Sequence, residues 1–410
     1  MPEPESTVVA PSVVSLAAVP GYDDFPLLLS RLREAMQDLG GMEAFVQPGQ
    51  RVLLKANLVA PTRPEQAVTT HPAVLRAVIR LVQEAGGIAC VGDGPGVGDT
   101  RTAMAVGGLL AVVQEEGAEM LEFDETAVFE NLSNRVGKRL SLCRHLQDCQ
   151  VLISLPKLKT HVQMAFTGAV KNQFGLIPGS AKGQMHFRFQ DRNRLADYLV
   201  DINRTARPAL AIMDAIVGME GPGPSGGTPR QIGALIVGSD LPAVDVVACT
   251  LIGLDPDANP LNLAARRAGY GTTRLEEIRL AGVPLADLQV HDYKLVQTPA
   301  NILRILPLPA SVLRWLRRQL SPRPSIDHRK CILCRRCTNG CPVNPPAIHP
   351  DAPPGQDIDE QTCIRCYCCH EFCPVKAIDL RRSRLDRCLH LNYLANKISR
   401  LLGKIVALWR

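Results

Sequence analysis

Short apolar runs alternate with amphipathic segments over much of the chain. Six runs are apolar enough for buried strands: residues 51–59, 88–92, 119–123, 151–155, 209–213 and 233–238. Three other segments have the spacing of amphipathic helices: residues 72–86, 100–116 and 242–253. This alternation predicts an α/β fold, with a mainly parallel sheet and helices on both of its faces.

The segment 72–86 carries the clearest helix signals. Pro72 occupies its first position and Gly86 stands at its end, the places where helices favour these two residues. His71 stands where an N-cap residue is expected. Capping and a role in a binding site therefore explain the His71 side chain equally well.

The composition of the chain predicts four parts. Residues 1–300 form the α/β domain, within which residues 219–230 are rich in Gly and Pro and predict a long irregular loop. Residues 301–325 are expected to form a linker with a short basic helix. Residues 326–380 predict a small α+β module, and residues 381–410 predict a basic amphipathic tail helix.

Charge and composition narrow the range of partners. The formal net charge is +6, and aromatic residues make up only 4% of the chain, so no nucleic-acid partner is expected. Docking of the tail on protein is the favoured interpretation of its basic stripe, and peripheral membrane contact is the alternative. No apolar run reaches about 18 residues, and no signal sequence precedes Val8, so a cytoplasmic location is expected.

Nine of the fourteen cysteines fall within residues 331–373. They form the run Cys-x2-Cys-x2-Cys-x3-Cys-Pro twice, which is the ligand run of bacterial ferredoxins. In such modules the fourth cysteine of each run serves the other cluster. We therefore expect two 4Fe–4S clusters, one held by Cys331, Cys334, Cys337 and Cys373 and the other by Cys363, Cys366, Cys369 and Cys341.

A zinc ribbon is the alternative for the same cysteines, because it is also built from Cys-x2-Cys units. One structural zinc ion takes four ligands, and two four-cysteine runs that each end in proline exceed that pattern. The repeat therefore favours the iron–sulfur interpretation, in which the module is ferredoxin-like. Cys368 is a further thiol that neither assignment needs.

A second group of polar residues stands at the ends of the predicted strands. Lys55 and Asn57 close the first strand, Asp93 closes the second, and residues 157–161 follow the strand at 151–155. In an open parallel sheet, ligands bind at the carboxyl ends of the strands. The lysines of this group predict an anionic small molecule, such as a carboxylate or a phosphate. A single lysine, in contrast, is more simply explained as a solvated surface charge.

We assign two kinds of role at this predicted site. Catalytic roles go to His161, Lys157 and Asp93. The residues assigned to ligand binding are Lys55, Asn57, His71, Lys159, Thr160, Thr167, Lys171 and Asn172. The glycine-rich run at 92–99 does not match G-x-G-x-x-G, so no organic cofactor is assigned.

Four stretches of the chain resemble one known family: VLLKANLV (52–59), AVTTHPAVLRAVIRLVQEAGG (67–87), VGDGPG (91–96) and LPKLKTHVQMAFTGAVKNQFGLIPG (155–179). They resemble the uncharacterised domain of unknown function 362, which is often fused to a bacterial-type ferredoxin module. The resemblance covers residues 8–300, and the module extends it to residue 380. Where that family usually has Lys-Pro-Asn, this chain has Lys55-Ala56-Asn57. The resemblance supports an iron–sulfur role and supplies no reaction.

Together these features favour a ferredoxin-dependent redox enzyme. A redox partner protein would exchange electrons with the module, and an anionic small molecule or cofactor would bind at the strand ends. Two alternatives stay open: a non-catalytic electron carrier whose large domain docks a partner, and a maturation factor that handles a metal or a cofactor. A carrier needs no convergent polar cleft, and this favours the enzyme.

Overall fold

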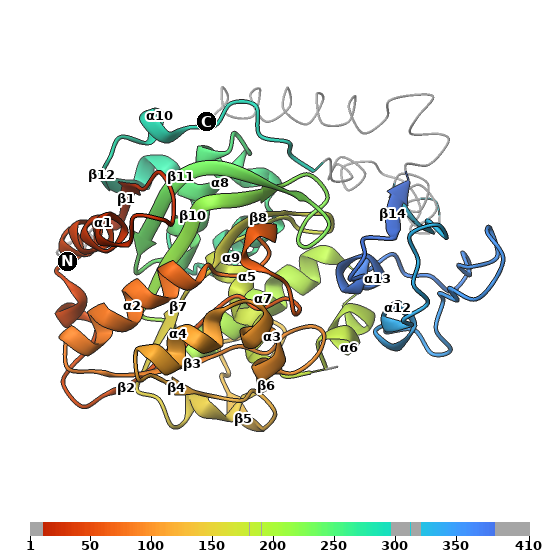
Figure 1. Cartoon of the computed structure of the whole chain (residues 1–410), viewed down its shortest axis with the longest axis horizontal. Helices are drawn as coiled ribbons and strands as arrows, with labels where there is room; N and C mark the ends of the chain where they lie inside the picture. The colour runs from red at the N-terminus through yellow and green to blue at the C-terminus, as the bar shows by residue number, and fades with distance from the viewer. Residues whose placement is uncertain (1–10, 180, 190, 297–311, 313–320, 382–410) are drawn as a thin grey trace, which may run out of the picture.

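The computed structural model describes residues 11–179, 181–189, 191–296, 312 and 321–381. Figure 1 shows a central sheet between two groups of helices, with a smaller module beside it at the right of the view. The smaller module is the cysteine-rich part of the chain. The predicted basic helix of the linker and the predicted tail helix fall outside the described residues.

The larger domain is built on a ten-stranded sheet. Its main order is β12 (Ile278–Gly282), β1 (Ser12–Ala18), β11 (Thr228–Gly238), β10 (Leu210–Glu220), β7 (Val151–Ser154), β2 (Arg51–Lys55), β3 (Ile88–Gly92) and β4 (Glu119–Met120). In addition, β8 (Lys157–His161) pairs with β10 and with β9 (Ala165–Thr167). The run from β10 to β4 is parallel, whereas β11 is antiparallel to both of its neighbours. The predicted α/β fold with a mainly parallel sheet is therefore confirmed.

Two hydrophobic cores lie on opposite faces of this sheet. One face is covered by α1 (Phe25–Gln37), α2 (Pro72–Glu84), α3 (Thr100–Val106) and α4 (Leu109–Glu115). The other face is covered by α5 (Ala169–Asn172), α7 (Arg192–Ala206), α8 (Leu241–Leu251) and α9 (Pro260–Ala268). Successive strand residues point to opposite faces, so Leu53 of β2 joins one core while Val52 and Leu54 join the other. This two-sided burial explains why the strands read as continuous apolar runs.

Further elements lie at the margins of the larger domain. The strands β5 (Thr126–Glu130) and β6 (Arg139–Cys143) form a separate hairpin. The helix α6 (Ala181–Arg188) lies near the cysteine module, and α10 (Leu285–Leu288) follows β12. No helix within the described ranges is long and apolar enough to cross a membrane.

Three expected elements differ from the observed ones. The helix expected over 100–116 is two helices, because Gly108 adopts a left-handed φ of 73° and interrupts it. The irregular loop expected over 219–230 is wrong at its two ends, since β10 and β11 extend into it and leave residues 221–227 between them. Residues 157–161, expected to follow a strand, themselves form β8.

The cysteine module repeats one backbone pattern twice. In the first cysteine run Leu333 and Arg335 have positive φ angles, and in the second run Arg365 and Tyr367 do the same, each 32 residues later by number. Each run then enters a short helix, α12 (Arg336–Asn339) or α13 (Cys368–Phe372). The strands β13 (Arg323–Ile326) and β14 (Ile378–Arg381) pair antiparallel and close the module.

Candidate functional site

A cavity lies at the carboxyl ends of β2 and β3 and along β8. Its empty volume is about 720 Å³, part of which is open to solvent. The larger domain contributes four lysines to its wall: Lys157, Lys159, Lys171 and Lys182. The cysteine module contributes three residues of α13: Cys368, Glu371 and Phe372. The cavity is therefore shared by the two parts of the chain.

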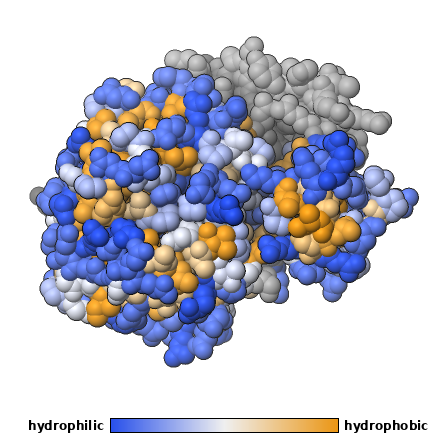
Figure 2. All heavy atoms as spheres, in the orientation of Figure 1, coloured by the Kyte–Doolittle hydropathy of each residue, from blue (hydrophilic) through white to orange (hydrophobic). Residues whose placement is uncertain are grey.

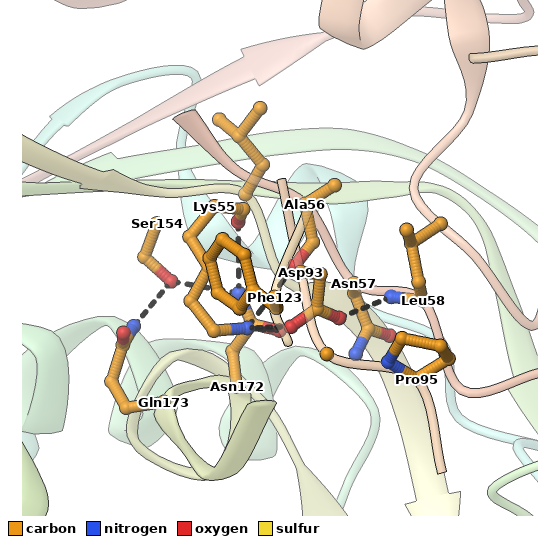
Figure 3. Close-up of polar contacts among 12 residues, drawn as sticks. Lys55, Ala56, Asn57, Leu58, Asp93, Pro95, Phe123, Ser154, Asn172 and Gln173 are labelled. Atoms are coloured by element: carbon orange, nitrogen blue, oxygen red, sulfur yellow. Dashed lines mark hydrogen bonds and ion pairs between the residues drawn. The ribbon is translucent and has the colours of Figure 1, made fainter. Parts of the chain in front are cut away.

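Lys55 and Asp93 form a closed ion pair beside this cavity (Figure 3). Lys55 Nζ lies 2.6 Å from Asp93 Oδ1, and Asp93 Oδ2 accepts the backbone N–H of Leu58 at 2.6 Å. The side chain of Asn172 donates to Ser154 Oγ at 3.0 Å and to the carbonyl of Lys55. These two hydrogen bonds hold Asn172 against the end of β2. Burial lowers the pKa of Lys55, while Asp93 opposes this shift. Both charges are already matched, so the pair shapes the cavity and binds no further charge.

Lys157 belongs to a second matched group. Its Nζ donates to Asp214 Oδ2 and to the hydroxyl of Tyr22, both at 2.8 Å. Asp214 also accepts the backbone N–H of His71, whose ring stacks on Tyr22 at 3.5 Å. The Nδ1 atom of His71 accepts the N–H of Ala73 and caps α2. His71 therefore caps a helix and holds Asp214, and it does not line the cavity in the described part of the chain.

Three cavity lysines differ from these two. Among the described residues, Lys159, Lys171 and Lys182 form no ion pair with a carboxylate. Lys159 donates to the amide oxygen of Asn57 and to a backbone carbonyl, and Lys182 donates to backbone carbonyls alone. Burial lowers the pKa of all three, to about 8 for Lys182. An anionic ligand would supply the negative charge that these three lysines do not receive from a carboxylate of the protein.

His161 lies behind the cavity wall. Its Nδ1 accepts the backbone N–H groups of Gln163 and Met164 at 3.1 and 3.2 Å, so the ring proton is on Nε2. Nε2 faces Glu371 Oε1 at 3.4 Å, and neither atom has a hydrogen bond within the described ranges. Burial lowers the pKa of His161 well below its usual value and raises that of Glu371. His161 is therefore neutral at pH 7 and supports a residue that lines the cavity.

Of the remaining residues predicted to bind the ligand, three line the cavity and one lies behind its wall. Asn57, Thr167 and Asn172 line the cavity. Thr160 instead donates its hydroxyl to the carbonyls of Met219 and Gly221, at the end of β10. Thr160 thus connects β8 to the turn that follows β10.

The turn between β10 and β11 holds α13 against the sheet. His370 Nε2 lies 3.0 Å from the carbonyl oxygen of Pro222, and the Ser225 hydroxyl donates to the carbonyl of Glu371 at 2.9 Å. On the other side of α13, the Phe372 ring lies close to Gly96, a position where a Cβ would approach the ring to 2.9 Å. These contacts keep the module side of the cavity in place.

Two smaller cavities lie inside the module, and each is lined by four cysteines. One holds Cys331, Cys334, Cys337 and Cys373, and the other holds Cys341, Cys363, Cys366 and Cys369. These are the two sets that the sequence repeat groups together. Among the described residues no three His, Cys, Asp or Glu side chains are close enough to hold one metal ion. The cluster assignment itself stays a prediction.

Comparison with known proteins places the larger domain in a family. The model of a domain of unknown function, DUF362, matches residues 52–250. A thylakoid-associated protein of Synechocystis sp. is 39% identical over 264 residues, which cover 64% of this chain and 81% of that protein. This chain belongs to the DUF362 family.

A solved structure shows a more distant likeness. The lactate racemase apoprotein from Thermoanaerobacterium thermosaccharolyticum aligns with a TM-score of 0.37 and 14% identity. The alignment covers 56% of this chain and 54% of that one, so the DUF362 protein spans about half the length of the racemase.

The segment matched by the DUF362 family contains all the cavity residues that the larger domain supplies, from Asn57 to Pro224. Several lining residues were not assigned from the sequence, among them Phe174, Lys182, His186, Glu371 and Phe372. Lys182 follows the family motif directly, and that proximity was the one available signal. Glu371 and Phe372 stand between Cys369 and Cys373, so only the packing of α13 on the sheet reveals them.

Proposed function

We propose that this DUF362 protein is an iron–sulfur redox enzyme that acts on an anionic small molecule bound in the shared cavity. The observation that carries the proposal is the position of α13. Its residues Cys368, Glu371 and Phe372 line the ligand cavity, while Cys369 lines one of the four-cysteine cavities. The short helix α13 therefore lines both the shared cavity and one of the four-cysteine cavities.

The module suits two 4Fe–4S clusters in its chemistry. Eight thiols surround two cavities in sets of four, and the other walls are mainly apolar. Backbone N–H groups of Ala347 and Ala377 donate to the sulfurs of Cys341 and Cys373 at 3.5 and 3.1 Å, which favours thiolates at these positions. Clusters bound there would supply and accept single electrons.

The side chains of the larger domain bind and orient the ligand in this proposal. Lys159, Lys171 and Lys182 hold its negative charge. Of the three residues predicted to be catalytic, Lys157 and Asp93 line the cavity, and His161 lies behind its wall with Nε2 3.4 Å from Glu371 Oε1. Because Asp93 already engages both oxygens, Lys157 is the best placed of the three to donate a hydrogen bond to the ligand.

The proposed redox partner would dock on the module. Figure 2 shows apolar side chains gathered on its exposed face. Ile332 and Leu333 are 61% and 55% exposed, and Ile332 and Val375 line the cavity of Cys331 and Cys334. An apolar patch of this kind on a protein surface marks an interaction site.

The location of the protein is also a proposal. We propose that it works in the cytoplasm, as the sequence suggests. The relative from Synechocystis is named as thylakoid-associated, so attachment of the basic residues 381–410 to a membrane surface is the alternative. Flotation of the full chain with anionic vesicles separates these two possibilities.

The redox proposal is tested on protein purified without oxygen. We expect iron and sulfide for two clusters, and an electron paramagnetic resonance signal after reduction by dithionite. Small molecules released from the protein by denaturation are identified by mass spectrometry and returned to the reduced protein. A returned ligand should speed reoxidation, and Lys171→Met should remove most of this effect while the exposed control Lys138→Met keeps it.

Zinc in place of iron, or protein without a reducible signal, would overturn the redox assignment. Intact clusters with no bound small molecule, and electron transfer to partners that Lys171→Met leaves unchanged, would instead identify a carrier.

A further inference from the structure

The charged groups around the shared cavity do not balance. Five lysines surround it: Lys55, Lys157, Lys159, Lys171 and Lys182. The carboxylates beside them are three: Asp93, Asp214 and Glu371. A fourth carboxylate, Asp245, lies behind the lining residue Gly168, and its oxygens accept the N–H groups of Ala169 and Val170. Within the cavity wall, three lysines without an ion pair therefore face one carboxylate, Glu371. His161 and His186 add none at pH 7, because burial lowers the pKa of both, to about 3 for His186.

The unmatched charges lie on one side of the cavity. Lys55 pairs with Asp93 and Lys157 pairs with Asp214, so the surplus belongs to Lys159, Lys171 and Lys182. Glu371 offsets part of the charge of Lys171 and Lys159. Buried cations without counter-ions are costly, and a ligand with two negative charges removes that cost.

The other side of the cavity is aromatic and apolar. Phe174 and His186 meet edge to face with ring centroids 5.7 Å apart, and Phe372 comes from α13. Leu58 and Val59 complete this wall. Aromatic rings pack best on flat or ring-shaped groups. Lys171 Nζ lies 5.8 Å from the Phe174 ring centroid, so the lysine side of the cavity adjoins its aromatic side.

We propose that the cavity takes a flat, conjugated dianion, with its charges on Lys159, Lys171 and Lys182 and its flat part against Phe174 and Phe372. This inference names the ligand class of the site and rests on the proposed function for its place in catalysis. Two kinds of compound are flat, conjugated dianions of this type. One is a flavin phosphate, with a tricyclic ring and a phosphate, and the other is a small conjugated dicarboxylate. A conjugated group is also one that accepts single electrons.

Binding is measured by anoxic calorimetry on the full iron-loaded chain. The flavin arm compares flavin mononucleotide with riboflavin, which lacks the phosphate. The dicarboxylate arm compares phthalate with benzoate, which has one charge, and with cis-cyclohexane-1,2-dicarboxylate, which is not flat. In at least one arm we expect the flat dianion to bind at least tenfold more tightly than each of its controls.

Lysine variants locate the binding. Lys171→Met and Lys159→Met should each weaken the flat dianion at least tenfold, and Lys138→Met on the exposed β5–β6 turn should leave it unchanged. Lys171 is only half-buried, so its variant keeps the test available where Lys159→Met does not fold.

Binding should also take up protons near pH 8.5. An anion beside Lys182 raises its lowered pKa, so the measured heat will depend on the ionisation enthalpy of the buffer. Lys182→Met should remove this dependence.

Two results would overturn the inference: flat dianions that bind no better than the controls in both arms, or affinity that survives both Lys159→Met and Lys171→Met. The proposed function fails separately, through missing iron or through reduced clusters that a bound dianion leaves unaffected.

Discussion

Lys182 shows how one buried cation affects both binding and stability. It stands in the first turn of α6, and its Nζ donates to the carbonyls of Gly94 and Pro95. The protein thus offers this ammonium group oxygen partners without offering it a negative charge. The cost of that arrangement is measurable through pH.

We expect the stability of the larger domain to rise between pH 8 and pH 10.5. Burial lowers the pKa of Lys182 from 10.5 to about 8 in the folded protein. In this window the unfolded chain binds more protons than the folded one, so stability increases with pH, by up to about 3 kcal/mol. Thermal midpoints at pH 7.5 and pH 9.5 measure the effect. Lys182→Met should reduce the rise, because it removes one of the buried lysines whose pKa is lowered, whereas Lys138→Met should keep the rise in full. An equal rise in both variants would contradict the assignment.

At the scale of elements, one helix is capped by a residue from another. The N-cap position of α5 is Gly168, which has no side chain to accept the first N–H groups. Asp245 of α8 fills this role, since its two oxygens accept the N–H groups of Ala169 and Val170 at 2.5 and 3.1 Å. The contact sets the direction of α5, which carries Lys171 into the cavity.

Asp245→Ala is expected to destabilise the larger domain by about 2–3 kcal/mol, because it leaves two buried N–H groups without acceptors. Ligand affinity should fall with it, as α5 loses its fixed orientation. Asp245→Asn keeps one acceptor oxygen and should cost less. Denaturation midpoints and calorimetry on the three proteins measure both effects. Equal stability of the Ala and Asn variants would show that the cap contributes little.

Elements set by local patterns could be predicted from the sequence, and those set by distant partners could not. The helix α2 begins at Pro72 as predicted, because proline and the apolar spacing act within the helix itself. The ends of β10 and β11 were missed, since Gly and Pro indicate a turn without telling how far the paired strands extend. The strand-end lysines were found as a group, but only the folded chain shows that Asp93 and Asp214 neutralise two of them.

At the scale of the whole molecule, the module depends on the turn after β10. Gly226 lies so close to α13 that a Cβ there would stand 2.5 Å from His370 Nε2. We expect Gly226→Ala to displace α13 and to speed hydrogen exchange over residues 368–372 by at least tenfold. Gly21→Ala is the matched control, because a Cβ there meets nothing within 4 Å. Unchanged exchange in α13 would mean that the turn does not hold it.

In the proposed iron–sulfur form of the protein, removal of iron is expected to unfold the module and leave the larger domain folded. Within the described residues, the central hydrophobic cluster of the module is small and consists of Ile326, Cys337, Ile348, Ile358 and Ile378, with cysteines packed against it. A core of this size does not stabilise a domain without a metal centre. Chelation under oxidising conditions, followed by hydrogen exchange, should show lost protection over 321–381 and kept protection in β2 and β3. Lasting protection of β13 and β14 would show that the module folds without iron.

The shared cavity also sets an order of events during biogenesis. Residues 52–250 emerge from the ribosome well before α13, yet α13 supplies one wall of the cavity. Until that helix docks, the cavity lacks this wall and cannot enclose a ligand. In the proposed enzyme, metal loading therefore comes first and ligand capture last, so an immature chain without its metal centres is also one that cannot sequester its ligand.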